Sequence, residues 1–146
     1  MPAVSQAPPI GVRQKLVEAA KQAAKDAVGK PYTPNGRTTA GFDCSGFVTY
    51  VYQKVFPGYV HLNTDAIISS PLYQKVQGSA QPGDLIFFPK GINPYDKKSY
   101  PNHVGIVLDS DAWMSSQTST GVSKVMLTNP WWSPRVKFFL RYSVLS

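Results

Sequence analysis

The sequence predicts an α+β fold in which N-terminal helices pack on an antiparallel sheet of about five strands. Apolar residues recur every three or four positions in the first part of the chain, as in helices that bury one face. From residue 85 onward, short runs of β-branched and aromatic residues alternate with turn-forming residues, as in a meander of strands. We expect one domain over residues 11–146, because a chain of 146 residues can enclose a single core.

The first predicted helix covers residues 12–28. Its apolar positions, many of them alanine, follow a helical period, and Gly29 with Pro31 just beyond it is typical of a helix end. We interpret this helix as scaffold. Residues 1–10 contain two consecutive prolines and no periodic apolar positions, so we expect a flexible tail there.

A second helix is predicted to begin at Cys44. Asp43 stands in the N-cap position, where its carboxylate can accept hydrogen bonds from backbone N–H groups of the first turn. Four apolar residues at helical spacing would then pack on the sheet: Phe47, Val48, Val51 and Val55. A short helix capped by Asn63-Thr64-Asp65 should follow and continue through residue 68.

The strands are expected at residues 85–88, 103–108, 112–117, 121–128 and 136–143. Turns at residues 109–111 and 119–121 would join consecutive strands. The long loop over residues 89–102 leads directly to His103, so we expect it to form one wall of a groove. A further loop carries Trp131 and Trp132. We expect one indole to pack on the core and leave packing or ligand binding open for the other.

Composition limits the function classes. Fifteen Lys and Arg residues against eight Asp and Glu residues give a net charge of +7, but the basic residues are scattered. We therefore favour a solvated basic surface over nucleic-acid binding. A single cysteine excludes an intramolecular disulfide, and no apolar stretch is long enough to span a bilayer. The first ten residues do not resemble a signal peptide, so we expect delivery by a non-classical route.

Cys44 is the leading candidate nucleophile. At a helix N-terminus, unpaired N–H groups and the helix dipole stabilise a thiolate, which predicts a pKa lowered from about 8.5 toward neutrality. The alternative for this residue alone is a small core hydrophobe. No metal site and no cofactor are expected, because one cysteine and two distant histidines give no obvious zinc site and the chain has no phosphate-binding glycine loop.

A nucleophilic thiol requires a base, and the chain offers two histidines. His103 directly precedes an apolar, β-branched run and so lies at the start of a predicted strand, whereas His61 is expected at the surface or in a capping region. If residues 112–117 pair with the strand after His103, Gln117 or Ser115 could accept the imidazole N–H and orient the ring. We favour Gln117 for its longer reach.

Over residues 14–143 the chain resembles the NlpC/P60 family of peptidoglycan endopeptidases. The resemblance rests on several motifs in the family's order: Gly29-Lys-Pro-Tyr32, Gly41-Phe-Asp-Cys-Ser-Gly-Phe-Val48, Gln81-Pro-Gly-Asp-Leu-Ile-Phe-Phe88, His103-Val-Gly-Ile106 and Ser119-Thr-Gly-Val122. It implies a circularly permuted papain-like fold. It also implies hydrolysis of bacterial stem peptides, usually between γ-linked D-glutamate and a diamino acid.

The resemblance also implies roles for individual residues. Cys44 would be the nucleophile and His103 the base, Tyr32 would shape the subsite, and Asp43 and Ser45 would contact the substrate. The family's third polar residue is most often a second histidine, whereas this chain has Ser115 roughly at that position. The orienting role is therefore assigned to either Gln117 or Ser115.

Alternatives remain at this stage. A peptidoglycan amidase or an acyltransferase on the same scaffold would use the same Cys–His pair. A non-catalytic cell-wall binding module would instead use its basic charge and Trp131 or Trp132. We expect a monomer that acts at the bacterial cell wall or periplasm, and we favour an antibacterial effector, for which a cognate inhibitor protein should exist.

Overall fold

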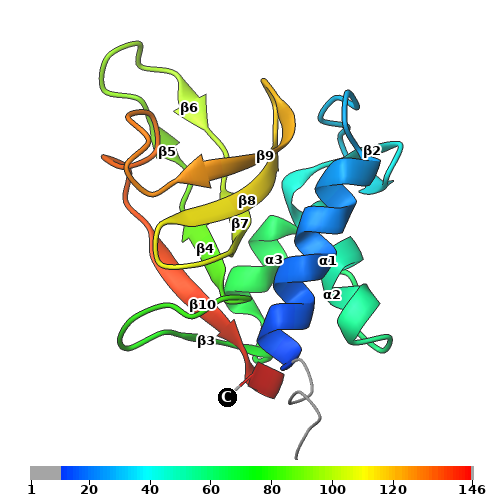
Figure 1. The fold of residues 1–146 in the computed structure, drawn as a ribbon. Coiled ribbons are helices and arrows are strands. Elements are labelled where there is room, and N and C mark those ends of the chain that lie inside the picture. The colour runs from blue at the N-terminus through cyan, green and yellow to red at the C-terminus, as the bar shows by residue number, and fades with distance from the viewer. Residues whose placement is uncertain (1–10, 146) are drawn as a thin grey trace, which may run out of the picture.

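The computed structural model describes residues 11–145, and the flexible tail expected over residues 1–10 lies outside this range. Helices pack against one face of a six-stranded antiparallel sheet (Figure 1). The helices are α1 Val12–Asp26, α2 Cys44–Val55, α3 Thr64–Ser69 and a 3₁₀ turn at Ser143–Leu145. The strands are β1 Arg37–Thr38, β2 Gly41–Phe42, β3 Tyr73–Lys75, β4 Leu85–Phe88, β5 Gly91–Ile92, β6 Ser99–Tyr100, β7 His103–Val107, β8 Ala112–Gln117, β9 Gly121–Met126 and β10 Phe138–Tyr142.

The large sheet has the strand order β3-β10-β4-β7-β8-β9, and all its neighbours run antiparallel. Strands β4, β7, β8, β9 and β10 correspond to the five predicted strands, with ends that differ by at most two residues. The α+β prediction is confirmed. The sixth strand, β3, was not predicted. It has three residues at the sheet edge with only Tyr73 buried, so it lacks the apolar alternation that marks a longer strand.

The first two helices lie near their predicted positions and bury apolar side chains. α1 stops at Asp26, two residues before the predicted end, and Gly29 adopts a left-handed φ of 78° after it. α1 buries Leu16, Val17, Ala20 and Ala23. α2 buries most of its apolar stripe, with Phe47, Val48 and Val51 fully enclosed, and packs on α1 and on β7.

The sheet is buried on both faces. Leu85 and Phe87 of β4 belong to the core beneath the helices, whereas Ile86 and Phe88 belong to a second apolar cluster. That second cluster includes Trp113 and is covered in part by Trp132 from the segment between β9 and β10. Because side chains alternate across a strand, β4 reads as the continuous apolar run Leu-Ile-Phe-Phe.

A buried carboxylate joins the first helix to the last strand. Asp84, whose side chain is fully enclosed, pairs with Arg13 of α1 at 3.0 Å and with Arg141 of β10 at 2.8 Å. Burial opposes ionisation of this carboxyl, but the hydrogen bonds from both arginines and from the Gln81 backbone lower its pKa overall. The pairs fix α1 and β10 to the turn that begins β4.

Within residues 11–145, no helix has both the length and the apolar character that crossing a membrane requires.

Candidate active site

Cys44 is the first residue of α2, as the sequence predicts. The Asp43 carboxylate accepts a hydrogen bond from the backbone N–H of Gly46 at 2.5 Å and another from Asn35 at 3.0 Å. A Cβ on Gly46 would overlap the carbonyl oxygen of Gly36, so only glycine allows this loop to lie against the first turn of the helix. The cap and the close loop place the sulfur at the end of the helix.

The Cys44 thiol is more buried than the sequence suggests. The residue is 6% exposed, and its Sγ lies 3.2 Å from Thr64 Oγ1 at the start of α3. Burial raises the pKa of the thiol, although hydrogen bonds from Thr64 and from the Val104 backbone act in the opposite direction. The predicted lowering of the thiol pKa is therefore wrong: the cost of desolvating the thiolate exceeds the gain from the helix N-terminus.

His103 is the first residue of β7, where it pairs with Phe88 of β4. Its imidazole stacks on Trp132 with ring centres 4.8 Å apart and an angle of 19° between the planes. Trp113 contacts the ring edge-on at 5.9 Å. Burial among these rings lowers the pKa of His103 to about 4, so the imidazole is neutral at physiological pH.

The expected hydrogen bond from His103 to Gln117 or Ser115 is not formed. The Ser115 hydroxyl donates instead to the Val104 carbonyl at 2.7 Å. The Gln117 carbonyl accepts from the Trp132 indole N–H at 3.2 Å, and its amide donates to Ser123. Within residues 11–145, His103 Nε2 is buried and has no hydrogen-bond partner.

The reason is the position of Trp132. The antiparallel register that pairs Ile106 with Met114, continued along both strands, brings Gln117 across from His103. The sequence therefore predicted that Gln117 lies near His103, but not the bonds that Gln117 forms there. Trp132 stacks on the imidazole, and its indole N–H bonds to the Gln117 carbonyl, so Gln117 contacts Trp132 in place of His103.

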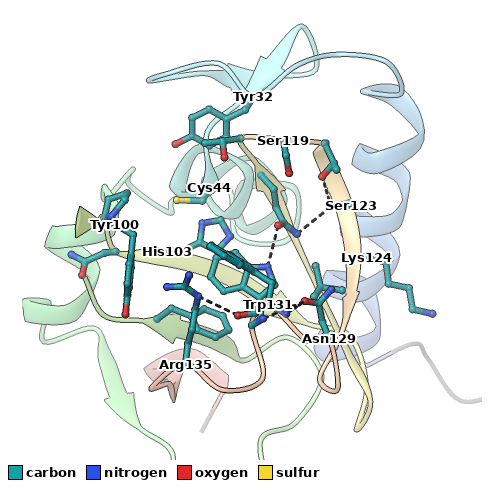
Figure 2. A pocket seen from close by; sticks show the side chains of 18 residues that line it. Tyr32, Cys44, Tyr100, His103, Ser119, Ser123, Lys124, Asn129, Trp131 and Arg135 are labelled. Carbon is teal, nitrogen blue, oxygen red and sulfur yellow. Dashed lines mark hydrogen bonds between the residues drawn. The ribbon is translucent and has the colours of Figure 1, made fainter. Parts of the chain in front are cut away.

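Cys44 and His103 line the same pocket, which has a volume of about 610 Å³ (Figure 2). Tyr32 lies at one end, and residues 100–102 of the long loop form one wall, as expected for that loop. Burial raises the pKa of Tyr32 to about 12, and the nearby Cys44 and Asp43 contribute, so its hydroxyl stays protonated. The remaining walls come from the β8–β9 turn and from the segment after β9.

Other sequence candidates lie outside this pocket. Asp43 and Ser45 do not line it, and their side chains bond to each other at 3.3 Å while Asp43 caps the helix. Their substrate contacts stay a prediction. His61 bonds through Nδ1 to Thr49 at 2.6 Å, in keeping with its assignment away from the site. Among residues 11–145, no group of three or more His, Cys, Asp or Glu side chains could hold a metal ion.

Trp132 and Arg135 are functional candidates that sequence reasoning missed or left open. Trp132 is the indole that packs on the core, whereas Trp131 is 55% exposed at the pocket. Arg135 was not singled out, because an isolated arginine in a loop has no local pattern that distinguishes it. Only the approach of the segment between β9 and β10 to His103 reveals both residues (Figure 2).

Comparison with known sequences identifies the family of this chain. The model of the NlpC/P60 family matches residues 29–141. The probable peptidoglycan endopeptidase LytE of Bacillus subtilis (strain 168) is 35% identical over 114 residues, which are 77% of this chain and 30% of that protein. The gamma-DL-glutamyl hydrolase of the same strain is 29% identical over 127 residues, 86% of this chain and 29% of that protein. The chain thus spans about 30% of the length of these two relatives.

Solved structures agree on the fold. An NlpC/P60 family protein from Bacillus cereus ATCC 10987 has a TM-score of 0.68 at 23% identity, covering 92% of this chain and 41% of that one. RipD from Mycobacterium tuberculosis, described as a non-catalytic NlpC/p60 domain protein adapted to peptidoglycan binding, has a TM-score of 0.58 at 19% identity, covering 91% and 98%. The family model matches most of this chain, and these structures share its fold. The chain therefore belongs to the NlpC/P60 family.

Proposed function

We propose that this chain is a cysteine endopeptidase that hydrolyses peptidoglycan stem peptides at the bond between γ-linked D-glutamate and the diamino acid. The observation that carries the proposal is the convergence of the Cys44 thiol and the His103 imidazole on one pocket. A thiol and an imidazole that line the same groove can act as the nucleophile and base of acyl transfer. The names of the two relatives support a hydrolase that acts on peptidoglycan or γ-glutamyl bonds.

The resting site holds a neutral pair. Burial raises the pKa of Cys44 and lowers that of His103, so the proton stays on sulfur until substrate arrives. As the sulfur attacks the scissile carbonyl, the S–H proton passes to the imidazole and a C–S bond forms. Because Nε2 is buried, Nδ1 is the ring nitrogen available for this transfer. The imidazolium then protonates the leaving amine as the C–N bond breaks, and water attacks the thioester to regenerate the thiol.

Two donors near Cys44 can stabilise the oxyanion. The backbone N–H of Cys44 belongs to the first turn of α2, where intrahelical acceptors are absent. The Tyr32 hydroxyl lies near Cys44 and stays protonated, because burial raises its pKa to about 12. We assign the Cys44 N–H and the Tyr32 hydroxyl to the oxyanion, in addition to the role of Tyr32 in shaping the subsite.

The proposal is tested by mass spectrometry of the fragments that the protein releases from purified sacculi. An endopeptidase produces soluble fragments with a new free amine on the diamino acid and a new carboxyl on D-glutamate. Intact stem peptides freed from the sugar would instead identify an amidase, and an acceptor adduct would identify an acyltransferase. Protein that sediments with sacculi and releases nothing would be a binding module. Each of these three results contradicts the endopeptidase.

Trp132 positions His103 and sets its pKa. Trp132→Ala removes the stacked indole and hydrates the imidazole, so the acidic limb of kcat/KM should move upward from about pH 4, toward the ordinary histidine value of 6.5. We expect kcat to fall about tenfold as well, because the ring loses its fixed orientation. The measurement is the pH profile of stem-peptide cleavage.

Trp132→Phe is the matched control for this change. It keeps an aromatic ring over His103 but removes the indole N–H that bonds to Gln117. The acidic limb should therefore stay near that of the unaltered protein. A limb that does not move in Trp132→Ala would show that Trp132 is only a packing residue.

We retain delivery as an effector, and a cognate inhibitor protein, as part of this proposal. The pocket offers an inhibitor a concave surface, with an exposed aromatic residue, Trp131, and an exposed cationic residue, Lys124, in its lining.

A further inference from the structure

Arg135 is held in the pocket by aromatic rings. Its guanidinium carbon lies 4.1 Å from the ring centre of Tyr100 and 4.1 Å from that of Trp131. Its Nε donates to the Trp131 carbonyl at 3.2 Å. Cation–π contacts and this hydrogen bond fix the plane of a side chain that is otherwise flexible. The Nη groups are left for a ligand.

No acidic side chain among the described residues forms an ion pair with Arg135. Both ion pairs formed within residues 11–145 involve Asp84, far from this wall. The residues that line the pocket include Lys124 and Arg135 but no aspartate or glutamate. A guanidinium remains charged at any relevant pH and presents two parallel N–H donors to a carboxylate. The pocket is therefore built to receive an anionic group.

The position of Arg135 indicates which part of the substrate carries that group. In Figure 2, Tyr32 and Arg135 lie on opposite sides of Cys44 and His103. In the proposed reaction His103 protonates the leaving amine, so the leaving diamino acid extends toward His103 and Arg135. The guanidinium lies 5.6 Å from the Trp132 ring, which itself stacks on the imidazole. It is thus one aromatic ring beyond the base, within reach of the end of a side chain.

We infer that Arg135 binds a free side-chain carboxylate on the diamino acid, and that the protein prefers stem peptides of the diaminopimelate type to those with lysine. This inference rests on the proposed function, which it extends to substrate specificity. A lysine side chain ends in the same ammonium group but has no carboxylate for Arg135 to bind. An amidated side-chain carboxyl keeps its shape but loses the charge.

The test compares kcat/KM for three synthetic peptides of the form L-alanyl-γ-D-glutamyl-X, each with the α-carboxyl of X amidated so that only the side chain differs. X is diaminopimelate, its side-chain amide, or lysine. The unaltered protein should prefer diaminopimelate at least tenfold. Arg135→Met should lower cleavage of that peptide about tenfold, chiefly through KM, and leave the other two within about twofold.

Lys21→Met is the matched control, because Lys21 is exposed on α1 and its replacement removes the same unit of charge. It should keep the preference of the unaltered protein. If Arg135→Met does not fold, Arg135→Lys is measured instead, since it keeps the charge but cannot form the two-point contact. A reduced preference in Arg135→Lys supports the inference, and an unchanged preference overturns it.

The remaining outcomes separate this inference from the proposed function. Equal cleavage of the three peptides by the unaltered protein overturns the inference and leaves the endopeptidase standing. An equal loss on all three peptides in a folded Arg135→Met also overturns it, since that variant would have lost the wall and not a specific contact. Cleavage of none of the peptides, together with no release from sacculi, overturns the proposed function and the inference with it.

Discussion

Replacing Cys44 with alanine should abolish the release of stem-peptide fragments from sacculi, to below about one-thousandth of the unaltered rate. No other side chain in the pocket can form the covalent intermediate, because the neighbouring hydroxyls of Thr118 and Ser119 are poor nucleophiles at neutral pH. The measurement is soluble muropeptide formed per unit time at saturating sacculi. Retained turnover in Cys44→Ala would exclude the cysteine mechanism.

Two further variants separate chemistry from structure in this test. Cys44→Ser preserves a hydrogen bond to Thr64 but replaces the thiol by a hydroxyl, and it should be as inactive as Cys44→Ala. Thr64→Val removes the hydrogen-bond partner and keeps the thiol, so it should retain activity within about tenfold of the unaltered protein. Thermal unfolding should show that all three variants remain folded, since removing one buried sulfur costs only about 1 kcal/mol.

Replacing His103 with alanine should lower kcat/KM by about 10³-fold, because the attacking thiol then has no proton acceptor and the leaving amine no donor. The unaltered protein should show a distinctive pH profile. The neutral imidazole is the active base, and burial lowers its pKa to about 4, so activity should persist well below pH 6.5 and decline only as the pH falls through about 4. The measurement is kcat/KM for a soluble stem peptide between pH 3 and 8, a range that includes both the transition near pH 4 and the ordinary histidine value of 6.5.

His61→Ala is the control, because His61 is the other histidine of the chain and bonds to Thr49 instead of lining the pocket. It should keep the rate and the pH profile of the unaltered protein. An acidic limb near pH 6.5 would contradict the stacked, desolvated imidazole. A profile that changes in His61→Ala but not in His103→Ala would identify His61 as the base and contradict the assignment to His103.

Several features of the fold could be predicted because they depend on neighbours in the sequence. The helix that starts at Cys44 follows from a carboxylate one residue earlier and an apolar stripe after it. The turn at residues 119–121 was predicted from its composition, and Gly121 indeed has a φ of 70° there. The short edge strand β3 escaped prediction, because three residues with one buried side chain carry no period.

The hydrogen bonds around His103 could not be predicted from the sequence. Strand register brought Gln117 to the neighbourhood of His103, but the register does not say which groups bond there. Trp132, from a loop after β9, occupies the face of the imidazole and takes the Gln117 carbonyl. Ser115, roughly at the position of the family's usual second histidine, bonds to the Val104 carbonyl, and the Trp132 ring stacks on His103.

By itself the sequence determined the family of the chain and the starts of α2 and β7, and it predicted Cys44 and His103 as nucleophile and base. These depend on residue type and on spacing along the chain, because helix caps, turns and apolar periods are formed by residues close in sequence. Only the tertiary structure decided the protonation states of Cys44 and His103 and the aromatic clamp on Arg135. Desolvation, stacking and cation–π contacts arise between segments far apart in the chain, and their strength depends on the distances to which folding brings them.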